Sequence, residues 1–351
     1  MASTVAIVLR TRDRELLLRR AVASVLAQTY RDYVLIVVND GGDPDVVDAV
    51  IADAAGLASC TVIHNAESVG REEAVNVGAF ATDAANADYL AILDDDDSWA
   101  PEYLSSTVAA LDASEDGGVA VRTEVVYERI EDGRIVELGR EILKSDSDRV
   151  TLTDTVYANW VPPTSLVVRR SLFAELGGWN GRLPVLADWD FNLRLLARAT
   201  IGFIDGEPLA FWHWRREQEG ALANSVVELA DVHTEFALLI RDAYLRSHDP
   251  DTANIGLLLF IAESFRREST AIGHHKDHIV QSSAHRFDQL DARLDVISQH
   301  LGGMSHAVDV MSQTIEQLED RITELEGERF GTKFVHAVQR AKRRLRGTPK
   351  S

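Results

Sequence analysis

The sequence predicts an α/β fold, with a mostly parallel, Rossmann-like β-sheet that carries helices on both faces. The main observation is the alternation of short β-branched runs with helical stretches between residue 5 and about residue 110, which is typical of βαβ units. The composition agrees, because 46% hydrophobic and 26% charged residues are ordinary for a globular protein. A length of 351 residues allows one large domain with an appendage, or two domains with a tail.

Each predicted element follows from its residue pattern. Strands are expected at residues 5–9, 33–38, 61–64, 89–93, 119–130, 134–143 and 164–168. Helices are expected at residues 15–26, 45–55, 72–81, from about 171, and 188–198. Residues 119–143 are expected to form one β-hairpin, because alternation flanks the turn signal Glu131-Asp132-Gly133. From Ala221 the pattern is helical, with one helix to about Arg246 and another to about Arg267. We therefore expect the first domain to end near residue 220.

Polar residues follow the first four predicted strands. They are Arg10-Thr11, Asn39 to Gly42, Asn65, and Asp94 to Asp97. Ligands of parallel sheets bind beyond the carboxyl ends of the strands. The sequence thus predicts a binding site at this edge of the sheet.

The run Asp94-Asp95-Asp96-Asp97 is the densest charge in the chain. Four adjacent carboxylates repel one another unless a cation intervenes, and hard divalent ions prefer oxygen ligands. A helix N-cap with surplus acid is the alternative. The position of the run at the carboxyl end of a strand argues for a metal site.

Several segments occur in a fixed order along the first 215 residues. They are Leu9 to Arg14, SVLAQTY at residues 24–30, Val38 to Gly42, Gly70 to Asn76, Asp94 to Asp96, and Ala187 to Asp190. Together they resemble the inverting GT-A glycosyltransferases of the large family 2 group, over about residues 4–215. The chain departs from the family pattern at Asn39 and Ala187, which replace acidic residues, and at Val75, which replaces an arginine.

The resemblance implies donor and metal sites. The implied donor-binding residues are Thr11, Asp40, Arg71, Asp94 and Asp95. Asp40 would accept a hydrogen bond from the base, Asp94 would lie near the ribose, and Arg71 would reach the base or a phosphate. Asp96 would bind a Mn²⁺ or Mg²⁺ ion, which offsets the charge of the leaving nucleotide diphosphate.

An inverting transfer also needs a general base that deprotonates the acceptor hydroxyl, and a carboxylate is the usual choice. The resemblance gives this role to Asp188. Asp190 is the alternative, but its offset of two residues points it away from Asp188 on a helix. His213 lies where many relatives have a histidine that completes the metal site, and a packed structural role is its alternative.

Apolar residues recur without interruption at spacings of three and four along the C-terminal part. They are Phe287, Leu290, Leu294, Ile297, Leu301, Met304, Val308, Met311, Ile315, Leu318, Ile322 and Leu325. Such heptads predict a coiled coil. Arg286 and Arg321 at g positions face Asp291 and Glu326 at e positions, as in parallel chains. A homodimer is our first expectation and a trimer the second. A long core helix is the alternative, but it would show a wider apolar stripe.

The last 24 residues, 328–351, carry eight basic residues and one acidic residue. Apolar residues recur there every three or four positions, so a helix would have a basic face and an apolar edge. Such a helix fits an anionic membrane surface. A solvated tail is the alternative.

The overall charge and the apolar runs exclude other classes. With 56 acidic and 36 basic residues, the chain has a net charge of -20, which disfavours nucleic-acid binding. Cys60 is the only cysteine, as expected in a reducing compartment. The apolar run at 255–262 is far shorter than the ~20 residues that span a bilayer. We expect a cytoplasmic protein, peripheral at the inner face of the membrane.

The sequence therefore predicts four parts. These are a GT-A domain at residues 1–220, a helical extension at 221–280, a coiled coil at 281–327 and a basic tail at 328–351. The expected activity is transfer of a sugar from a nucleotide donor to a surface-polysaccharide or lipid-linked glycan acceptor. UDP is the most frequent nucleotide in the family, with dTDP and GDP open. A catalytically degenerate scaffold that recruits partner enzymes is the alternative, and a nucleotidyltransferase fits less well because its phosphate loop is absent.

Overall fold

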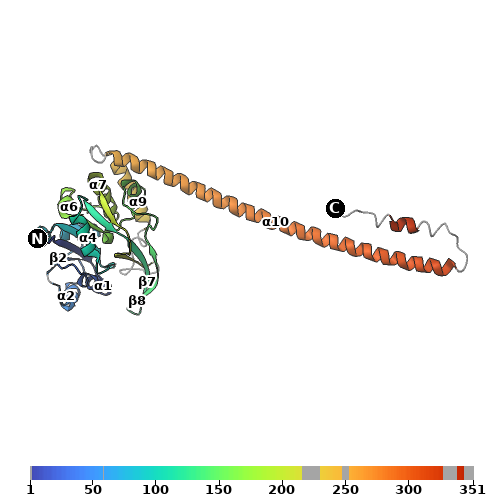
Figure 1. Ribbon diagram of the computed structural model, residues 1–351, viewed down its shortest axis with the longest axis horizontal. Helices are drawn as coiled ribbons and strands as arrows, with labels where there is room; N and C mark the ends of the chain where they lie inside the picture. Colours follow the sequence, from blue (N-terminus) through green and yellow to red (C-terminus); the bar gives the residue numbers. More distant parts are fainter. Residues whose placement is uncertain (1, 58, 216–229, 247–252, 327–337, 344–351) are drawn as a thin grey trace. The chain divides into compact units, whose positions relative to one another are not determined.

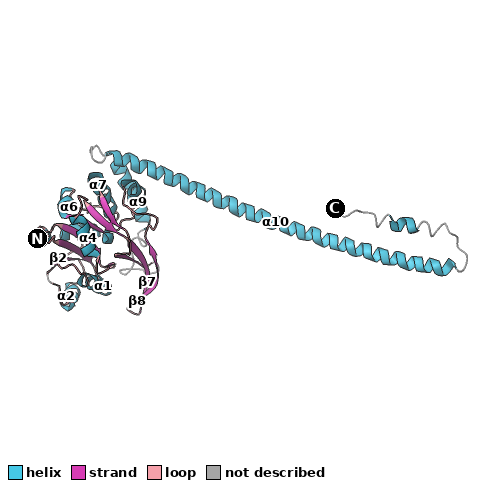
Figure 2. Cartoon of the chain, in the orientation of Figure 1, coloured by secondary structure: helices cyan, strands magenta, loops and turns pink. Residues whose placement is uncertain are grey.

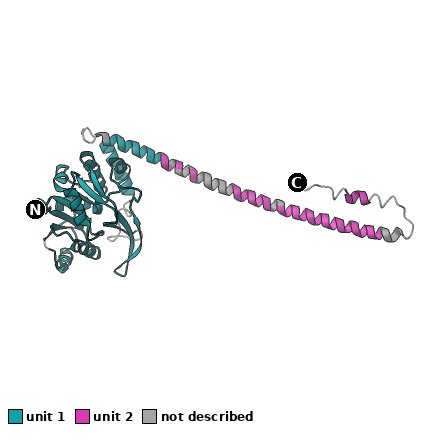
Figure 3. Ribbon diagram, in the orientation of Figure 1, with its two compact units in different colours: residues 1–267 teal, residues 268–351 magenta. Residues whose placement is uncertain are grey.

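The computed structural model describes most of the chain (Figure 1). The described residues are 2–57, 59–215, 230–246, 253–326 and 338–343. Contacts divide the chain into two compact units, Met1–Arg267 and Glu268–Ser351, which Figure 3 colours separately. Among the helices that are described, none has both the length and the apolar content to cross a membrane.

A seven-stranded sheet lies at the centre of the first unit (Figure 2). In spatial order its strands are β10 (Ile201–Ile204), β6 (Gly118–Val121), β9 (Leu166–Arg169), β4 (Tyr89–Asp94), β1 (Val5–Thr11), β2 (Tyr33–Asp40) and β3 (Cys60–Asn65). Only β9 runs antiparallel to its neighbours in this sheet. The predicted mostly parallel, Rossmann-like sheet is confirmed.

Helices cover both faces of this sheet, because alternate residues of each strand point to opposite sides. Val5 and Ile7 of β1 pack in one core cluster, and Ala6 and Val8 pack in the other. The first cluster includes α1 (Glu15–Leu26), α2 (Pro44–Asp53) and α4 (Tyr103–Asp112), and the second includes α3 (Arg71–Ala79), α6 (Arg170–Glu175) and α7 (Ala187–Arg198). The result is a three-layer α/β/α domain.

A smaller sheet adjoins the edge where the predicted site lies. Its strands, in order, are β5 (Ser98–Trp99), β11 (Ala210–Trp214), β7 (Thr123–Glu131) and β8 (Arg134–Ile142). The sequence pattern did not identify β10 or β11. The hairpin turn at residues 131–133 is confirmed, with Asp132 and Gly133 both at positive φ.

The expectation of one strand over residues 119–130 is wrong. The chain changes sheets at Arg122, so that β6 joins the large sheet and β7 the small one. Arg122 is buried at this corner, and its guanidinium donates to Asp205 and to two backbone carbonyl groups. Alternation alone does not reveal such a corner, because both strands remain extended through it.

Two further helices follow the sheets, α9 (Ala230–Arg246) and α10 (Ala253–Glu326). The description of α9 stops at Arg246, so the predicted end there is not tested, whereas the predicted end near Arg267 is wrong because α10 is a single helix of 74 residues that extends to Glu326. The expected helix start at 221 and the break at 248–250 lie outside the described residues. Ile240, Tyr244, Ile255 and Leu259 pack against Trp189 and Leu193 of α7, with Val156 of α5 (Leu152–Tyr157). This packing attaches α9 and the start of α10 to the α7 side of the domain.

The predicted heptad stripe lies on α10, within the second unit. Phe287, Leu294, Leu301 and Met304 are exposed by 60% or more. The side chains of Ile297, Ile322 and Leu325 are outside the described set. Of the predicted basic tail, residues 338–343 are described and helical, and the rest lies outside the description.

Candidate active site

The four predicted polar strand ends converge at one edge of the large sheet. In the parallel registers, Arg10 lies opposite Asp94, Thr11 opposite Asn39, and Asp40 opposite Asn65. These pairs come from β1, β2, β3 and β4, which are neighbours. The prediction that the strand ends meet is confirmed.

Arg10, at the end of β1, and Arg14, just before α1, hold the first two aspartates of the acidic run. Asp94 accepts hydrogen bonds from Arg10 Nε at 2.6 Å and Nη2 at 3.0 Å. Asp95 accepts from Thr11 Oγ1 at 2.8 Å and from Arg14 Nη1 at 3.2 Å. Thr11 is therefore oriented by Asp95 at this edge.

A buried ion-pair network holds the third aspartate. Arg215, which is fully buried, donates from Nη2 to Asp96 Oδ2 at 2.5 Å and from Nη1 to Glu128 Oε1 at 2.7 Å. Arg20 also pairs with Glu128, at 2.6 Å, and donates to the backbone carbonyl of Asp96. Asp96 and Glu128 each have two cationic partners, so removing Arg215 would leave each of these buried carboxylates with one ion pair fewer.

His213 lies beside the cluster and has partners on both ring nitrogens. Its Nδ1 is 2.9 Å from Glu128 Oε2, and its Nε2 is 2.8 Å from Ser98 Oγ. An ionised carboxylate can only accept, so Nδ1 carries the hydrogen. The backbone N–H of His213 donates to Asp97 at 3.1 Å. This geometry makes His213 a neighbour of the aspartates, and its role as a metal ligand stays a prediction.

The environments of the aspartates shift their pKa values in different directions. Burial raises the pKa of Asp95 to about 6. Burial, with the neighbouring Asp96 and Asp94, raises the pKa of Asp97 well above its usual range. Burial also acts on Asp96, but Arg215 and Arg14 outweigh it and lower the pKa of that carboxyl group. Asp96 is thus the carboxylate most firmly held in its charged form.

Three of the four aspartates can offer oxygens to one cation. One carboxylate oxygen each from Asp94, Asp96 and Asp97 lies within 4.8 Å of the others. These are hard oxygen donors, which Mg²⁺ and Mn²⁺ accept. The prediction named Asp96 for this role and omitted Asp97, although Asp97 belongs to the same run.

Asp40 organises a loop at the end of β2. Its two carboxylate oxygens accept from Asn65 Nδ2 at 2.9 Å, Ser68 Oγ at 2.6 Å, Val69 N at 2.8 Å and Gly70 N at 3.2 Å. Burial opposes ionisation, but these hydrogen bonds outweigh it and lower the pKa of Asp40. Both carboxylate oxygens of Asp40 thus bind the loop. The contact of Asp40 with a nucleotide base stays a prediction.

Asn39, which replaces an acidic family residue, makes contacts that require an amide. Its Nδ2 donates to the carbonyl of Gly42 at 2.9 Å and lies 3.1 Å from His64 Nδ1, while its Oδ1 accepts from Gly42 N. A carboxylate at this position could not donate to the carbonyl. The substitution therefore fits the turn that follows β2.

Asp188 lies in the first turn of α7. The preceding Leu186 has a left-handed backbone with φ of 65°, a conformation that is strained for a residue with a large side chain. Asn159 Nδ2 donates to Asp188 Oδ2 at 2.6 Å. Burial, reinforced by the charge of Glu72, raises the pKa of Asp188 to about 6. The side chain is thus a carboxylate at neutral pH and a stronger base than an ordinary aspartate.

Arg10 and Glu72 connect Asp188 to the acidic run. Arg10 pairs with Asp94 and lies 3.5 Å from Glu72, and Glu72 pairs with Arg71 at 2.9 Å. Glu72 and Arg71 both act on the charge of Asp188. The structure therefore brings Arg71 to Asp188 and Glu72, at the start of α3.

Asp190 has other partners. Its Oδ2 pairs with Arg194 at 2.8 Å, and its Oδ1 accepts from the hydroxyl of Tyr244 at 3.1 Å. Asp190 thus links α7 to α9. Asp188, in contrast, lies within the electrostatic influence of Glu72 and Arg71.

Sequence reasoning placed Arg10 at this edge without a partner, and it missed most of the other charged residues there. These are Arg14, Arg20 and Arg215, together with the acid Glu128. A signal existed for Arg215: it follows His213 by two residues, and residues at that spacing along an extended strand point to the same side.

The comparisons with known proteins agree with this architecture. Residues 5–177 match the family described as Glycosyl transferase family 2. Among curated proteins, the chain is 27% identical over 200 residues to the "PGL/p-HBAD biosynthesis glycosyltransferase" of Mycobacterium bovis (strain BCG / Pasteur 1173P2), covering 56% of this chain and 71% of that protein.

Among solved structures, the chain is similar to S. aureus TarS residues 1–349, with a TM-score of 0.54, 17% identity, and coverage of 73% of this chain and 69% of that chain. The TarS structure in complex with UDP-GlcNAc matches with a TM-score of 0.52, 16% identity, and coverage of 73% and 70%. At such identities the similarity concerns the fold, and it supports the GT-A architecture.

Proposed function

Because the chain is a glycosyltransferase that carries a family 2 domain, we propose that it transfers a sugar, with inversion, from a nucleotide-diphosphate donor to a hydroxyl group of a surface polysaccharide or lipid-linked glycan. The observation that carries the proposal is the connection between the acidic run and a carboxylate of raised pKa, Asp188, through Arg10 and Glu72. TarS, which shares the fold, has been solved with UDP-GlcNAc, and this supports a UDP-sugar donor.

The acidic run fits a divalent cation. Asp94, Asp96 and Asp97 can each offer one oxygen within a 4.8 Å span, and oxygen donors suit Mn²⁺ or Mg²⁺. When bound, such an ion would neutralise charge on the leaving diphosphate. Arg215 and Arg14 keep Asp96 charged and oriented before any ligand arrives.

Asp188 is the proposed general base. A base acts best when its pKa lies near the working pH, and burial brings the pKa of Asp188 to about 6. Asn159 donates to one of its oxygens and so fixes the carboxylate orientation, while the other oxygen accepts the proton of the acceptor hydroxyl. Arg71 and Glu72 adjust the charge around this group.

Turnover of nucleotide sugars tests this assignment. Full-length protein is incubated with a panel of UDP-, dTDP- and GDP-sugars and Mn²⁺ or Mg²⁺, and release of the nucleotide and formation of a glycan product are measured. Asp188→Asn should lower transfer by about 10²- to 10⁴-fold, because general base catalysis is worth that much. Asp190→Asn is the matched control on the same helix, and it should keep most of the activity.

Equal losses in the two variants would contradict the role of Asp188. If the wild-type protein turns over none of the nucleotide sugars, the alternative of a degenerate scaffold is supported instead.

The helix α10 supports a second proposal, assembly of two copies through a parallel coiled coil. Its heptad residues, such as Leu294 and Leu301, are 60% exposed in the single chain, and exposed stripes of this length are covered in stable proteins. Leu301→Asp with Val308→Asp should convert the dimer to a monomer in sedimentation experiments. Val310→Asp is the control, since Val310 is 47% exposed but lies off the stripe. A dimer that survives the double substitution would rule out this interface.

The basic tail supports a peripheral location at an anionic, cytoplasmic membrane face. Each basic residue near such a surface contributes about 1 kcal/mol. Replacing Arg340 and Arg343 with glutamine should weaken cosedimentation with phosphatidylserine vesicles and leave the background with neutral vesicles unchanged. Equal binding by both proteins would contradict a role for the tail.

A further inference from the structure

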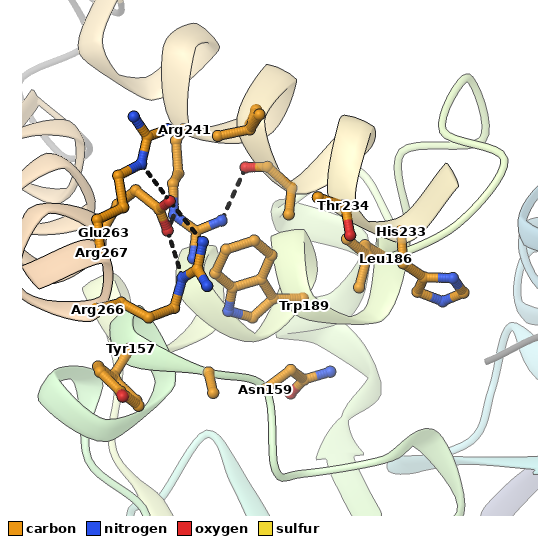
Figure 4. A pocket seen from close by; sticks show the side chains of 13 residues that line it. Tyr157, Asn159, Leu186, Trp189, His233, Thr234, Arg241, Glu263, Arg266 and Arg267 are labelled. Atoms are coloured by element: carbon orange, nitrogen blue, oxygen red, sulfur yellow. Dashed lines mark hydrogen bonds and ion pairs between the residues drawn. The ribbon is translucent and has the colours of Figure 1, made fainter. Parts of the chain in front are cut away.

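A pocket lies beside the proposed base, on the side where α9 and α10 pack. It has a volume of about 500 Å³ and is lined by residues of α7, α9, the first turns of α10 and the segment that follows α5. Figure 4 shows Arg241, Glu263, Arg266 and Arg267 gathered at one end, Trp189 in the middle, and His233 at the other end. All the residues that line it belong to the first compact unit.

Three arginines gather around one carboxylate at this end of the pocket. Glu263 accepts hydrogen bonds from Arg266 Nε at 2.8 Å and Nη2 at 2.7 Å, and from Arg267 Nε at 2.8 Å. Arg241 Nε lies 3.8 Å from the same carboxylate. Three guanidinium groups therefore share one carboxylate among the residues that line the pocket.

Arg241 is the least satisfied of the three. The residue is only 9% exposed, and its buried Nε has no hydrogen-bond partner in the described protein, because 3.8 Å is too long for a hydrogen bond. Its Nη1 donates to the carbonyl of Ala237 at 3.0 Å, and its guanidinium lies over the ring of Trp189 at 4.6 Å. The stacking fixes the plane of the guanidinium, and burial lowers its pKa. A buried cation with an unused donor is costly unless an anion reaches it.

One residue connects the pocket to the proposed base. Asn159 lines the pocket and donates to Asp188 at 2.6 Å, while Asp188 itself lines a separate, smaller cavity. A molecule in this pocket can thus contact Asn159, which orients the proposed base, while its other end contacts the arginines. A donor nucleotide has its own site at the acidic edge of the sheet.

We propose that this pocket binds the acceptor, and that the acceptor carries an oxyanion, a phosphate or a carboxylate group, which Arg241, Arg266 and Arg267 hold. Guanidinium groups bind both anions through paired N–H donors. The identification of the ligand as the acceptor rests on the proposed function, whereas the oxyanion site does not. A purely structural clamp between α9 and α10 is the competing explanation for the cluster.

Binding of small anions to the full-length protein tests the proposal. Inorganic phosphate and glucuronate are titrated by calorimetry, and glucose is the neutral control. The double variant Arg266→Gln with Arg267→Gln should weaken binding of the preferred anion about tenfold, since charge-assisted hydrogen bonds are lost. Both side chains are about half exposed or more, so the fold should survive. Arg246→Gln on α9 is the matched control, because Arg246 is exposed and pairs with Asp242 outside the pocket.

Glu263→Gln gives a test of opposite sign. Removing this carboxylate frees the guanidinium groups and should tighten anion binding about threefold or more, whereas a structural clamp would be loosened with no gain in affinity. Which anion binds, phosphate or glucuronate, identifies the source of the oxyanion. The proposal is overturned if neither anion binds at millimolar concentrations, or if all the variants bind alike.

Hydrolysis of a UDP-sugar by the wild-type protein is measured in parallel, because it reports on the donor edge. Arginine-dependent anion binding without hydrolysis would contradict the proposed function and keep the oxyanion site. Hydrolysis without arginine-dependent binding would keep the proposed function and overturn the site.

Discussion

The acidic edge of the sheet and the pocket under α9 contain the same residue types in opposite proportions. At the edge, Asp94 to Asp97 and Glu128 are five carboxylates, and the arginines that pair with them are Arg10, Arg14, Arg20 and Arg215. In the pocket, three arginines share Glu263. Ion pairs at the edge fix the carboxylates before a ligand binds, whereas in the pocket the buried Nε of Arg241 has no hydrogen-bond partner among the described residues and can donate to a ligand. The comparison predicts different responses when one charge is removed.

The largest effect is expected at the buried centre of the edge. Arg215→Met removes a fully buried guanidinium that pairs with Asp96 and Glu128. Two buried carboxylates then each lose one ion-pair partner, although Arg14 still pairs with Asp96 and Arg20 with Glu128, and breaking a buried pair costs about 3–5 kcal/mol. The free energy of unfolding, from urea denaturation at pH 7, should fall by that amount.

The double variant Arg215→Met with Glu128→Gln is the control for this prediction. It also removes the charge of Glu128, one of the two carboxylates that lose an ion pair, and should recover part of the lost free energy of unfolding. If Arg215→Met alone were as stable as the wild type, the edge would not be held by this network, and its contrast with the pocket would disappear.

Asp188 lies between the two regions, and its removal should stabilise the protein. Its pKa rises from 3.8 to about 6 on folding, so the folded state disfavours the charged form. A raised pKa gives stability below pH 3.8 that is lost as the pH rises through 6. Asp188→Asn avoids this loss and should be more stable at pH 8 by up to about 3 kcal/mol, at 1.36 kcal/mol per pKa unit.

The gain should shrink between pH 6 and pH 4, and denaturation curves at pH 8, 6, 5 and 4 measure it. The same variant should lose activity, so that stability and turnover change in opposite directions. A variant that is less stable than the wild type at pH 8 would show that Asp188 has a partner strong enough to offset its burial.

Glu263 in the pocket should show the opposite pH dependence. Hydrogen bonds from Arg266 lead the causes that lower its pKa from 4.5 to about 2. A lowered pKa gives stability above pH 4.5 that is lost as the pH falls toward 2. Glu263→Gln should therefore destabilise the protein at pH 7 by about 1–2 kcal/mol, after discounting for its exposed partners. The difference should decline below pH 5. A difference that is constant from pH 7 to pH 3 would mean that packing, and not charge, is lost.

Local patterns predicted what depends on neighbours in the sequence. The strand at residues 5–9 is a short continuous apolar run, as expected for a strand buried on both faces. The apolar residues from Phe287 to Leu325 recur every three or four positions, which is the spacing of one helix face. The convergence of Thr11, Asp40 and Asp94 could be predicted as well, because parallel strands end at the same edge.

Contacts between distant segments could not be predicted in this way. Arg215 meets Asp96 across 119 positions and Glu128 across 87, and these contacts depend on a small sheet whose strand β11 has no distinctive pattern. Arg241 was not identified because its position over Trp189 depends on how α9 packs against α7. The sequence thus indicated the edge where the polar strand ends meet. It did not indicate which arginines pair with the carboxylates there, or where the pocket between α7, α9 and α10 lies.

The smallest effect is expected at Arg246, a cation on the same helix as Arg241 but outside the pocket. Its side chain is 77% exposed and pairs with Asp242 four residues earlier. Exposed pairs at this spacing contribute little to stability, and salt screens them. Arg246→Gln should therefore leave the free energy of unfolding almost unchanged, and 0.5 M NaCl should remove any difference. It should also leave anion binding unchanged. A larger loss of stability or of anion binding would mean that the positive charges along α9 act together. The affinity of the pocket for anions would then come from the charge of the whole helix and not from the buried Arg241.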